Sequence, residues 1–334
     1  MTLPATHREV HLVARPEGPL DTENFRIIEA PMPKPGPGQV LVRNRLMSVV
    51  AVMRTLMEGD TRLPMPPYGL GEAMWGPAVG EVVAAPMADL RPGDLVTHRH
   101  GWREYAAVDE AGAQRIDPEV LPDLAAHLSQ GPTAWLGVRA AEVGPGDTVF
   151  VTGAAGGVGS LAGQFARLRG ATRLIGSTGS VRKGRYLVEE LGYDAAVIRG
   201  AGPIEEQLRK AAPDGVDAIF DNVGGEQLTA GLAVARRGAR VALVGTLSGQ
   251  VSGGFTAPVE IDTGHLILQA ITLRGISGGA QSDAILQAMH EFGRGLRDGT
   301  ITFPHTVLAG IEQAPRALCE LLEGRHIGAV LVEL

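Results

Sequence analysis

The chain has 334 residues, 44% of them hydrophobic, with 30 basic and 37 acidic side chains and a formal net charge of −7. This composition excludes a disordered chain and a basic surface for nucleic acid, and the length predicts two domains. Because Cys319 is the only cysteine and no run reaches about 18 apolar residues, we expect no intrachain disulfide, no cysteine zinc cluster, no membrane span and no signal peptide, and a cytoplasmic location.

The first 125 residues or so are predicted to be rich in β-structure. Apolar and polar residues alternate over Phe25–Glu29, and the segments 39–46, 79–85 and 95–97 also read as strands. Proline and glycine form turns between these runs, for example at 31–38. Short strands between turns predict a partly open β-barrel.

From about Leu128 the pattern changes to strands that alternate with helices. The predicted strands lie near 148–152, 173–177, 195–198, 216–221 and 239–245, and the predicted helices near 158–169, 182–191, 203–211 and 226–236. This alternation predicts an α/β fold with a parallel, doubly wound sheet. A helix over about 281–297 and short strands near 303–308 and 328–332 follow, and we expect this tail to rejoin the first domain.

The stretch 148–160 (TVFVTGAAGGVGS) runs from an apolar strand through closely spaced glycines into a helical pattern. Glycines let the backbone turn sharply without a Cβ, and the start of the following helix offers free N–H groups to a phosphate. The next strand arrives about 20 residues later, as a βαβ unit requires. The alternative is a glycine turn without a ligand. We predict a dinucleotide pyrophosphate site formed by Gly153, Ala154, Ala155, Gly156, Gly157, Val158 and Gly159.

The end of the second strand in this unit distinguishes NAD from NADP. An NAD site places a carboxylate there for the ribose 2′-hydroxyl, whereas the 2′-phosphate of NADP needs cations. Here the strand ends in 176–180 (GSTGS) without a carboxylate, and Arg182 and Lys183 follow. We therefore predict NADP(H) as the cofactor. The alternative is that Arg182, Lys183 and Arg185 form a solvated helix face.

Five motifs carry a resemblance to a known family: 70–76 (LGEAMWG), 131–135 (GPTAW), 154–160 (AAGGVGS), 213–217 (PDGVD) and, as the most specific, 220–226 (FDNVGGE). On these the chain resembles the medium-chain dehydrogenase/reductase superfamily over nearly its whole length. Within it, the chain is similar to the zinc-free branch of prostaglandin reductases, leukotriene B4 dehydrogenases and plant double-bond reductases.

This resemblance implies a Rossmann domain at 128–297 that binds NADP. It implies a GroES-like, partly open β-barrel as the substrate domain, in two pieces at 1–127 and 298–334, with the active site in the cleft. It also implies a homodimer whose sheets join through the edge strand, which we place at Ile271–Ile276.

The resemblance also implies further contacts to the cofactor. Lys183 matches a position that clamps the 2′-phosphate, and Arg199 stands where the family often has Tyr. His326 stands where the family has Asn, so it either contacts the cofactor or lies in solvent. The other expected contacts are Ser177, Asn222 and Gly245.

Four residues are expected beside the nicotinamide, from their position in the chain and from the resemblance: Thr133, Thr246, Ser277 and Gly278. Two of them have a simpler interpretation. Thr133 could instead cap a helix that starts near Ala134, and Ser277 could simply form a turn with its glycines.

Catalytic zinc requires three protein ligands, usually Cys and His. Gly71 stands where zinc-using relatives in the superfamily place His, and the strand entering 48–51 has no Cys. His98 and His100 could share one face of a strand, but no third ligand lies near them in the sequence. We therefore expect hydrogen-bonded or solvated histidines and no metal.

The reaction implied by the resemblance is hydride transfer from NADPH to the β-carbon of a carbonyl-conjugated alkene. Such a reaction needs a group that stabilises the enolate. Where the family has Tyr-Asn after the fifth Rossmann strand, this chain has Gln250 and Val251. Gln250 can donate a hydrogen bond to an oxyanion but cannot supply a proton at neutral pH, so we expect the proton to come from water or a cofactor hydroxyl.

The substrate pocket is expected to be apolar. The family motif S-V-D-P-Y-M-R reads SVVAVMR at 48–54, so both the Asp and the Tyr are lost. Val50, Val52, Met53 and Tyr68 are predicted to line the pocket, and Trp135 either lines it or, as we favour, belongs to the core. The expected substrates are small apolar enones, enals or quinones.

Three functions therefore stay open. The first is NADPH-dependent reduction of the carbon-carbon double bond of enones or enals without a metal. The second is quinone reduction, because quinones are vinylogous enones. The third is an NADPH-binding sensor with little catalysis, which the loss of the family Tyr at position 250 motivates.

Overall fold

The structure is a computed structural model that describes residues 3–59, 61, 63–85, 89–276 and 282–334. The chain forms two compact units. Unit 1 comprises 1–129, 250–255 and 305–334, and unit 2 comprises 130–249 and 256–304.

Unit 2 contains a parallel sheet in the order β11-β10-β9-β12-β13-β14. Its first strand in the chain, β9, lies in the interior of the sheet, so the chain winds outward in both directions and the predicted doubly wound sheet is confirmed. The strands are β9 (Thr148–Val151), β10 (Arg173–Thr178), β11 (Ala195–Ile198), β12 (Val216–Asp221), β13 (Ala235–Leu243) and β14 (Thr272–Gly275).

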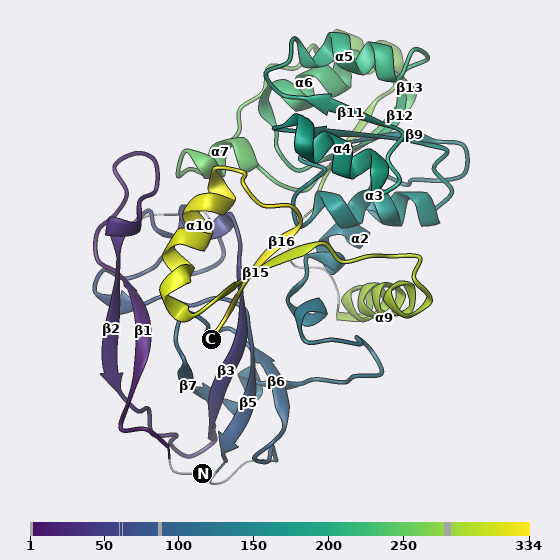
Figure 1. Cartoon of the computed structure of the whole chain (residues 1–334). Helices are drawn as coiled ribbons and strands as arrows, with labels where there is room; N and C mark the ends of the chain where they lie inside the picture. The colour runs from purple at the N-terminus through teal and green to yellow at the C-terminus, as the bar shows by residue number, and fades with distance from the viewer. Residues whose placement is uncertain (1–2, 60, 62, 86–88, 277–281) are drawn as a thin grey trace. The chain divides into compact units, whose positions relative to one another are not determined.

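Helices cover both faces of this sheet because neighbouring residues of a strand point in opposite directions. Ile219 lies under Gly231 of helix α6, whereas the ring of Phe220 lies against Gly137 of helix α2. Both side chains are fully buried. Helices α5 and α6 pack together on one side, and α2 and α3 pack together elsewhere in the unit (Figure 1). The helices are α2 (Gly131–Ala140), α3 (Gly159–Leu168), α4 (Val181–Glu189), α5 (Ile204–Ala211), α6 (Gly225–Ala233), α8 (Thr263–Gln269) and α9 (Ser282–Asp298).

The predicted boundary between the helix at 226–236 and the strand at 239–245 is wrong. Helix α6 ends at Ala233, and β13 already pairs Ala235 with Val216 before its register shifts. In the irregular stretch Gly238 has a φ of 80°, and the Arg236 guanidinium lies 2.8 Å from Asp217 Oδ2. In this bulged part of the strand, apolar and polar residues do not alternate with a period of two. The sequence pattern therefore extended the predicted helix too far.

Unit 1 is built on a sheet in the order β15-β16-β3-β5-β6-β8, with β7 also paired to β3. The C-terminal strand β16 is antiparallel to β3, with Val330 opposite Val49, and Figure 1 shows these yellow and purple strands side by side. A smaller sheet has the order β2-β1-β4. The strands are β1 (Thr6–Leu12), β2 (Phe25–Pro31), β3 (Gln39–Val49), β4 (Glu72–Ala73), β5 (Ala78–Ala84), β6 (Leu95–His98), β7 (Tyr105–Asp109), β8 (Gln114–Arg115), β15 (His305–Ala309) and β16 (Ala329–Glu333).

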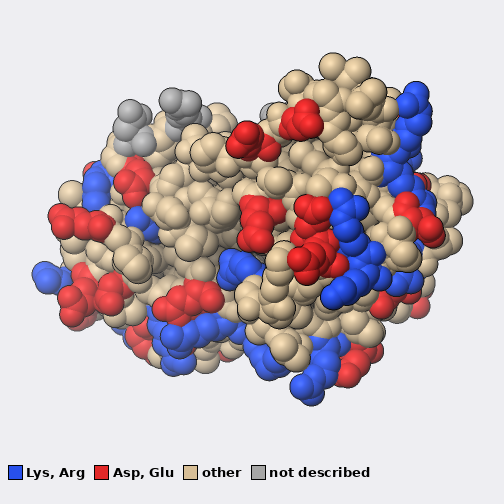
Figure 2. All heavy atoms as spheres, turned by 90° about the horizontal axis from the view of Figure 1, so that it is seen from above, with Lys and Arg blue, Asp and Glu red and all other residues tan. Residues whose placement is uncertain are grey.

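The sequence patterns did not predict α8, and they also did not predict the helices α1 (Val52–Leu56), α7 (Leu247–Val251) and α10 (Ala314–Leu322). Short 3-10 turns lie at Thr22–Asn24, Glu110–Gly112, Ala125–Leu128 and Ile311–Gln313. In the described parts of the chain, none of the helices combines the length and the apolar character needed to cross a bilayer. On the face that Figure 2 shows, basic and acidic side chains are interspersed rather than gathered by sign.

We predict that Gly163→Ala destabilises unit 2. A Cβ at Gly163 of α3 would overlap the ring of Tyr193, whose hydroxyl donates a 2.9 Å hydrogen bond to the Gly159 carbonyl. Overpacking of this kind costs about 1–3 kcal/mol, which urea unfolding would measure. Gly144→Ala is the matched control, because its Cβ has no heavy atom closer than 4.0 Å. Equal unfolding free energies for the two variants would contradict the packing argument.

Candidate active site

The glycine turn follows β9 at the carboxyl edge of the parallel sheet. Gly153 has a φ of 61°, and a Cβ on Gly159 would overlap the Gly153 carbonyl oxygen. The turn therefore folds back onto the first residue of α3, which only glycine permits at these two positions. This arrangement brings the backbone of 153–158 to the N-terminal end of the ten-residue helix α3.

Three N–H groups of this turn are available to a ligand. Within the described residues, the N–H groups of Ala155, Gly157 and Val158 donate no hydrogen bond to another group of the chain. Backbone N–H groups at a helix N-terminus attract anions, because the helix dipole adds to their partial positive charge. The turn fits a phosphate or pyrophosphate group.

The ends of β9 and β12 are tied together by the buried carboxylate of Asp221. Thr152 Oγ1 donates a 2.8 Å hydrogen bond to Asp221 Oδ1, and the Gly224 N–H donates one of 3.0 Å to Oδ2. The Asn222 N–H in turn donates to Thr152 Oγ1 at 2.8 Å. Asp221 is 1% exposed, and burial raises the pKa of its carboxyl. This network fixes the turn at 222–224.

Ser177, near the end of β10, joins the glycine turn to helix α6. The Gly153 N–H donates a 3.0 Å hydrogen bond to Ser177 Oγ, and Ser177 Oγ itself donates to Gln227 Oε1. Ser177 is fully buried. The predicted contact residue Ser177 thus lies against the turn, and its hydroxyl is already engaged by protein groups.

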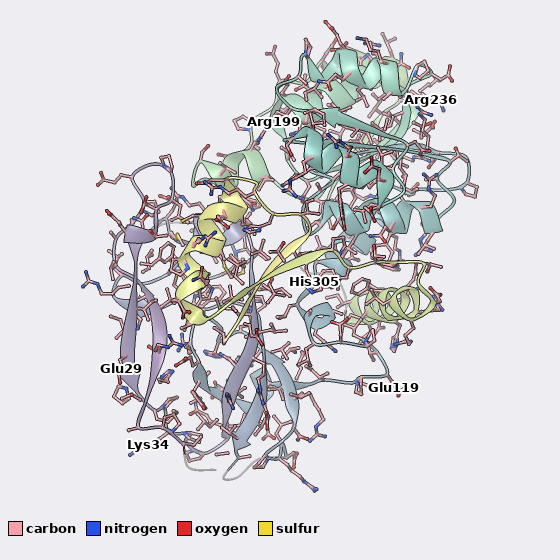
Figure 3. The ribbon with its side chains drawn as sticks, viewed as in Figure 1. Glu29, Lys34, Glu119, Arg199, Arg236 and His305 are labelled. Atoms are coloured by element: carbon pink, nitrogen blue, oxygen red, sulfur yellow. The ribbon has the colours of Figure 1, made fainter. Side chains whose placement is uncertain are left out.

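Two cations lie beyond the end of β10. Lys183 is 8% exposed on α4, and burial together with the nearby Arg182 and Arg199 lowers its pKa to about 8. A Cβ on Gly179 would lie 3.3 Å from the Arg199 guanidinium. Arg199 and Arg236 lie on different sides of unit 2 in Figure 3, and only Arg199 follows the carboxyl end of a strand.

This cluster has the charge expected for a phosphate site. In the part of the chain that the structure describes, neither Lys183 nor Arg199 forms an ion pair with a carboxylate. Of the three basic residues that we considered as a solvated face, Arg182 and Arg185 are exposed but Lys183 is buried. Burying an ammonium group without a counter-ion is costly, so an anionic ligand would stabilise the cluster.

The residues that follow β12 and β13 form a second part of the candidate site at the carboxyl edge of the parallel sheet. Asn222 Oδ1 lies where a Cβ on Gly245 would be, so Gly245 allows the Asn222 side chain to pack on the backbone. Thr246 Oγ1 is buried and has no hydrogen-bond partner among the described residues. A buried hydroxyl without a partner at this edge of the sheet is suited to bind a polar group of a ligand.

Helix α2 also belongs to unit 2. It begins at Gly131 with Gln130 as its N-cap, so Thr133 lies inside the first turn and does not cap the helix. Thr133 is exposed, whereas Trp135 is 2% exposed and donates a 2.9 Å hydrogen bond to Glu291 Oε2. Trp135 is therefore a core residue. The predicted contacts Ser277 and Gly278 lie outside the described residues.

The predicted substrate residues lie in unit 1. Met53 and Tyr68 are 1% and 2% exposed in its core, and Tyr68 donates a 2.8 Å hydrogen bond to the Trp75 carbonyl. Val50 and Val52 are half-buried. Of these residues, the two valines offer the accessible apolar surface, and a role for all four in a substrate pocket stays a prediction.

Gln250 and His326 also belong to unit 1. Gln250 is half-buried at the end of α7, and its carbonyl accepts a 3.0 Å hydrogen bond from the Gly253 N–H. His326 Nε2 lies 3.0 Å from Glu320 Oε2, so a carboxylate holds this ring.

Of the histidine pair that could suggest a metal, His98 is buried and His100 is half-buried. His98 Nδ1 accepts a 3.1 Å hydrogen bond from the His100 N–H, and burial lowers the pKa of His98 to about 3. Across the ranges that the structure describes, no three His, Cys, Asp or Glu side chains are placed to hold a metal ion.

Two family models match the chain: an N-terminal domain of oxidoreductases over residues 8–116 and a zinc-binding dehydrogenase domain over residues 157–293. The chain belongs to the medium-chain dehydrogenase/reductase superfamily, in the branch of the prostaglandin reductases.

Individual relatives are similar along most of their length. The chain is 30% identical to the NADPH-dependent curcumin reductase of Escherichia coli, over 97% of this chain and 95% of the relative. It is 30% identical to prostaglandin reductase 1 of Oryctolagus cuniculus, over 93% and 88%. Among solved structures, CurA of Vibrio vulnificus in complex with NADPH has a TM-score of 0.88 and 28% identity, with 98% of each chain covered.

Several site residues could not be found by sequence reasoning. Asp221 lies in the most specific motif, but the motif does not indicate its role. Thr152 is predicted only as the end of a strand, and no sequence pattern indicates a role for Gln227. Their roles arise from hydrogen bonds between segments about 25 to 70 residues apart, which no local pattern reveals.

We predict that Thr152→Val destabilises unit 2, because it removes the hydroxyl that donates to a buried carboxylate. The loss is about 1–3 kcal/mol near neutral pH, measured by urea unfolding. The folded pKa of Asp221 is raised, so its contribution to stability is full at low pH and decreases as the pH rises through that pKa.

Removing the Thr152 donor disfavours the ionised carboxylate further, so the deficit of the variant should shrink as the pH falls and Asp221 becomes protonated. Thr172→Val is the control, because the Thr172 hydroxyl is exposed and donates to the Gly146 carbonyl. A deficit that does not change with pH would contradict the role of Asp221.

Proposed function

We propose that the protein is an NADPH-dependent oxidoreductase that reduces the carbon-carbon double bond of α,β-unsaturated carbonyl compounds without a metal. The observation that carries the proposal is the combination of the glycine turn with the buried Lys183 and the nearby Arg199, at a strand end without a carboxylate. The relatives named for NADPH-dependent reduction support the same cofactor.

Different residues of unit 2 are proposed to bind different parts of NADPH. The N–H groups of Ala155, Gly157 and Val158 would bind the pyrophosphate, and Lys183 and Arg199 would bind the 2′-phosphate. The unpartnered Thr246 hydroxyl is proposed to contact the nicotinamide end. When bound, NADPH supplies a hydride for the β-carbon of the substrate. Thr133, Ser177, Asn222, Gly245, Ser277 and Gly278 stay proposed contacts, as does His326, which belongs to unit 1.

The chain must also stabilise the negative charge that develops on the substrate oxygen. We assign this role to the Gln250 amide, which donates hydrogen bonds but cannot supply a proton at neutral pH. The proton for the α-carbon then comes from water or a cofactor hydroxyl. The apolar Val50 and Val52 favour small, uncharged enones and enals over charged substrates.

The test is to mix the purified protein with NADPH and a panel of enones, enals and quinones, and to follow the loss of the reduced-nicotinamide absorbance. We expect faster turnover of the aliphatic enones and enals than of the quinones. Faster turnover of quinones would replace the proposal by quinone reduction. Tight NADPH binding without turnover of any compound would instead support a sensor.

We predict that Lys183 selects NADPH over NADH. Lys183→Met should raise the KM for NADPH by about tenfold to a hundredfold, because it removes a charged hydrogen bond, and should leave the KM for NADH unchanged. Arg185→Met is the control, since Arg185 is exposed on the same helix. Equal effects on both cofactors would contradict the assignment.

From the lowered pKa of Lys183 we predict that the KM for NADPH depends on pH. The pKa of Lys183 is about 8 without a ligand, so the ammonium is lost as the pH rises above that value. The KM for NADPH should therefore rise between about pH 8 and 10 in the wild-type protein, and this rise should be absent in Lys183→Met. A parallel rise of the KM for NADH would show that another group is titrating.

We also propose that the protein is a homodimer joined through the edge strand at Ile271–Ile276. Strand β14 ends the sheet order, and the nearby helix α8 exposes 77% of Ile267 and 70% of Leu268. An open strand edge beside exposed apolar side chains favours association with a second sheet.

Sedimentation velocity tests the dimer. The double variant Ile267→Asp with Leu268→Asp should sediment as a monomer, because charges oppose burial of the α8 surface. Val188→Asp, at another exposed apolar side chain of unit 2, should leave the dimer intact. A wild-type monomer at micromolar concentration would refute this part of the proposal.

A cytoplasmic location is the last part of the proposal. Cys319 is half-buried, and burial raises the pKa of its thiol to about 11, so the thiol is not activated for oxidation. Such a thiol is compatible with a reducing compartment.

A further inference from the structure

Residues 250–255 form a small substructure within unit 1. They include the last two residues of helix α7, and their contacts place them in unit 1 rather than with the sheet of unit 2. The Gly253 N–H donates to the Gln250 carbonyl at 3.0 Å, which closes a turn. We call residues 250–255 the Gln250 segment.

Helix α1 holds this segment at two points. Thr55 Oγ1 donates a 3.1 Å hydrogen bond to the Gly254 carbonyl. One residue earlier in each segment, the Arg54 guanidinium lies directly against Gly253. A Cβ on Gly253 would lie 2.7 Å from Arg54 Nη2 and 2.6 Å from Glu58 Oε1, and the φ of Gly253 is 89°. The contact therefore requires glycine for both space and conformation.

The two terminal nitrogens of the Arg54 guanidinium are bound by protein groups, whereas its buried Nε has no hydrogen-bond partner among the described residues. Arg54 is 2% exposed, its Nη1 donates to the Glu58 carboxylate one helical turn away, and its Nη2 donates to the Gly18 carbonyl at 3.2 Å. A buried guanidinium is retained only when paired and hydrogen-bonded. Because its planar fork is enclosed by protein groups, Arg54 offers no accessible surface to a substrate and can act only through the residues that it contacts.

The segment that Arg54 holds has an accessible surface. Gln250 is half-buried, and the side chains of Val251 and Phe255 are 43% and 40% exposed. Helix α7 has no buried residue, so packing of its own side chains does little to fix its end. Hydrogen bonds to the Asn222 and Val223 carbonyls hold the start of α7, so the anchor at Gly253 and Gly254 acts on its C-terminal end, where Gln250 lies.

We propose that Arg54 is a positioning residue that, through Gly253, holds Gln250 in place to stabilise the substrate oxyanion. The proposal rests on the proposed function for its catalytic consequence, whereas the anchoring itself is independent of the reaction. Catalytic donors lose much of their effect when displaced by about 1 Å, because the hydrogen bond must be aimed at the developing charge.

Two variants test the anchor. Arg54→Lys keeps the charge and loses the planar fork, and Gly253→Ala places a methyl group against the Arg54–Glu58 pair. Gly238→Ala is the matched control, because Gly238 also has a positive φ, of 80°, but an open space around its Cβ. Hydrogen exchange of the amides at 247–255 should accelerate at least about tenfold in the first two variants and stay unchanged in the control.

A double-mutant cycle tests the link to Gln250. Gln250→Ala should lower kcat about a hundredfold for an enone, as loss of an oxyanion donor does. Arg54→Lys should lower kcat at least about tenfold in the wild-type background and less than about twofold in the Gln250→Ala background. The dissociation constant of NADPH should not change in any of these variants.

The outcomes separate the two proposals. Unchanged amide exchange at 247–255 in both anchor variants, or kcat losses that multiply independently in the double variant, would overturn the positioning role. Absence of turnover by the wild-type protein would overturn the proposed function, and the exchange experiment would then still decide whether Arg54 anchors the segment.

Discussion

The carboxylate of Asp221 joins the ends of two adjacent central strands, because it accepts hydrogen bonds from the Thr152 hydroxyl and the Gly224 N–H. This carboxylate is deeply buried and has no cationic partner among the described residues, so the loss of one donor is costly. The same network orients the N–H of Asn222 and sets where β9 gives way to the glycine turn. The geometry of the candidate cofactor site therefore depends on one buried acidic group.

Two hydrogen-bonded anchors of this kind organise the candidate chemistry, one in each unit. In unit 2, Asp221 fixes the backbone that would meet the pyrophosphate. In unit 1, the Arg54–Glu58 pair fixes the segment that carries Gln250. Each anchor uses a buried charge beside a glycine with a positive φ, Gly224 or Gly253. In both units a buried charged group thus holds a turn beside the candidate site.

Much of unit 2 could be predicted from the sequence, because strands buried on both faces and amphipathic helices have distinct periods. The turn at Gly153 and the parallel sheet were predicted in this way. The bulge at Arg236–Ala239 was not, because its arginines and Gly238 lack the alternation of a strand. The placement of Lys183 in the protein interior could not be predicted either, since it depends on how α4 packs. The anchors need contacts such as Thr55 with Gly254, about 200 residues apart in the chain, which local patterns cannot contain.

The central claim is that the protein transfers a hydride from NADPH to the β-carbon of an enone. The most direct measurement is to supply NADPH labelled with deuterium at the transferable position and to locate the label in the product by NMR. The account predicts one deuterium at the β-carbon and a proton from solvent at the α-carbon. Deuterium at the carbonyl carbon, with the double bond intact, would contradict it and show carbonyl reduction instead.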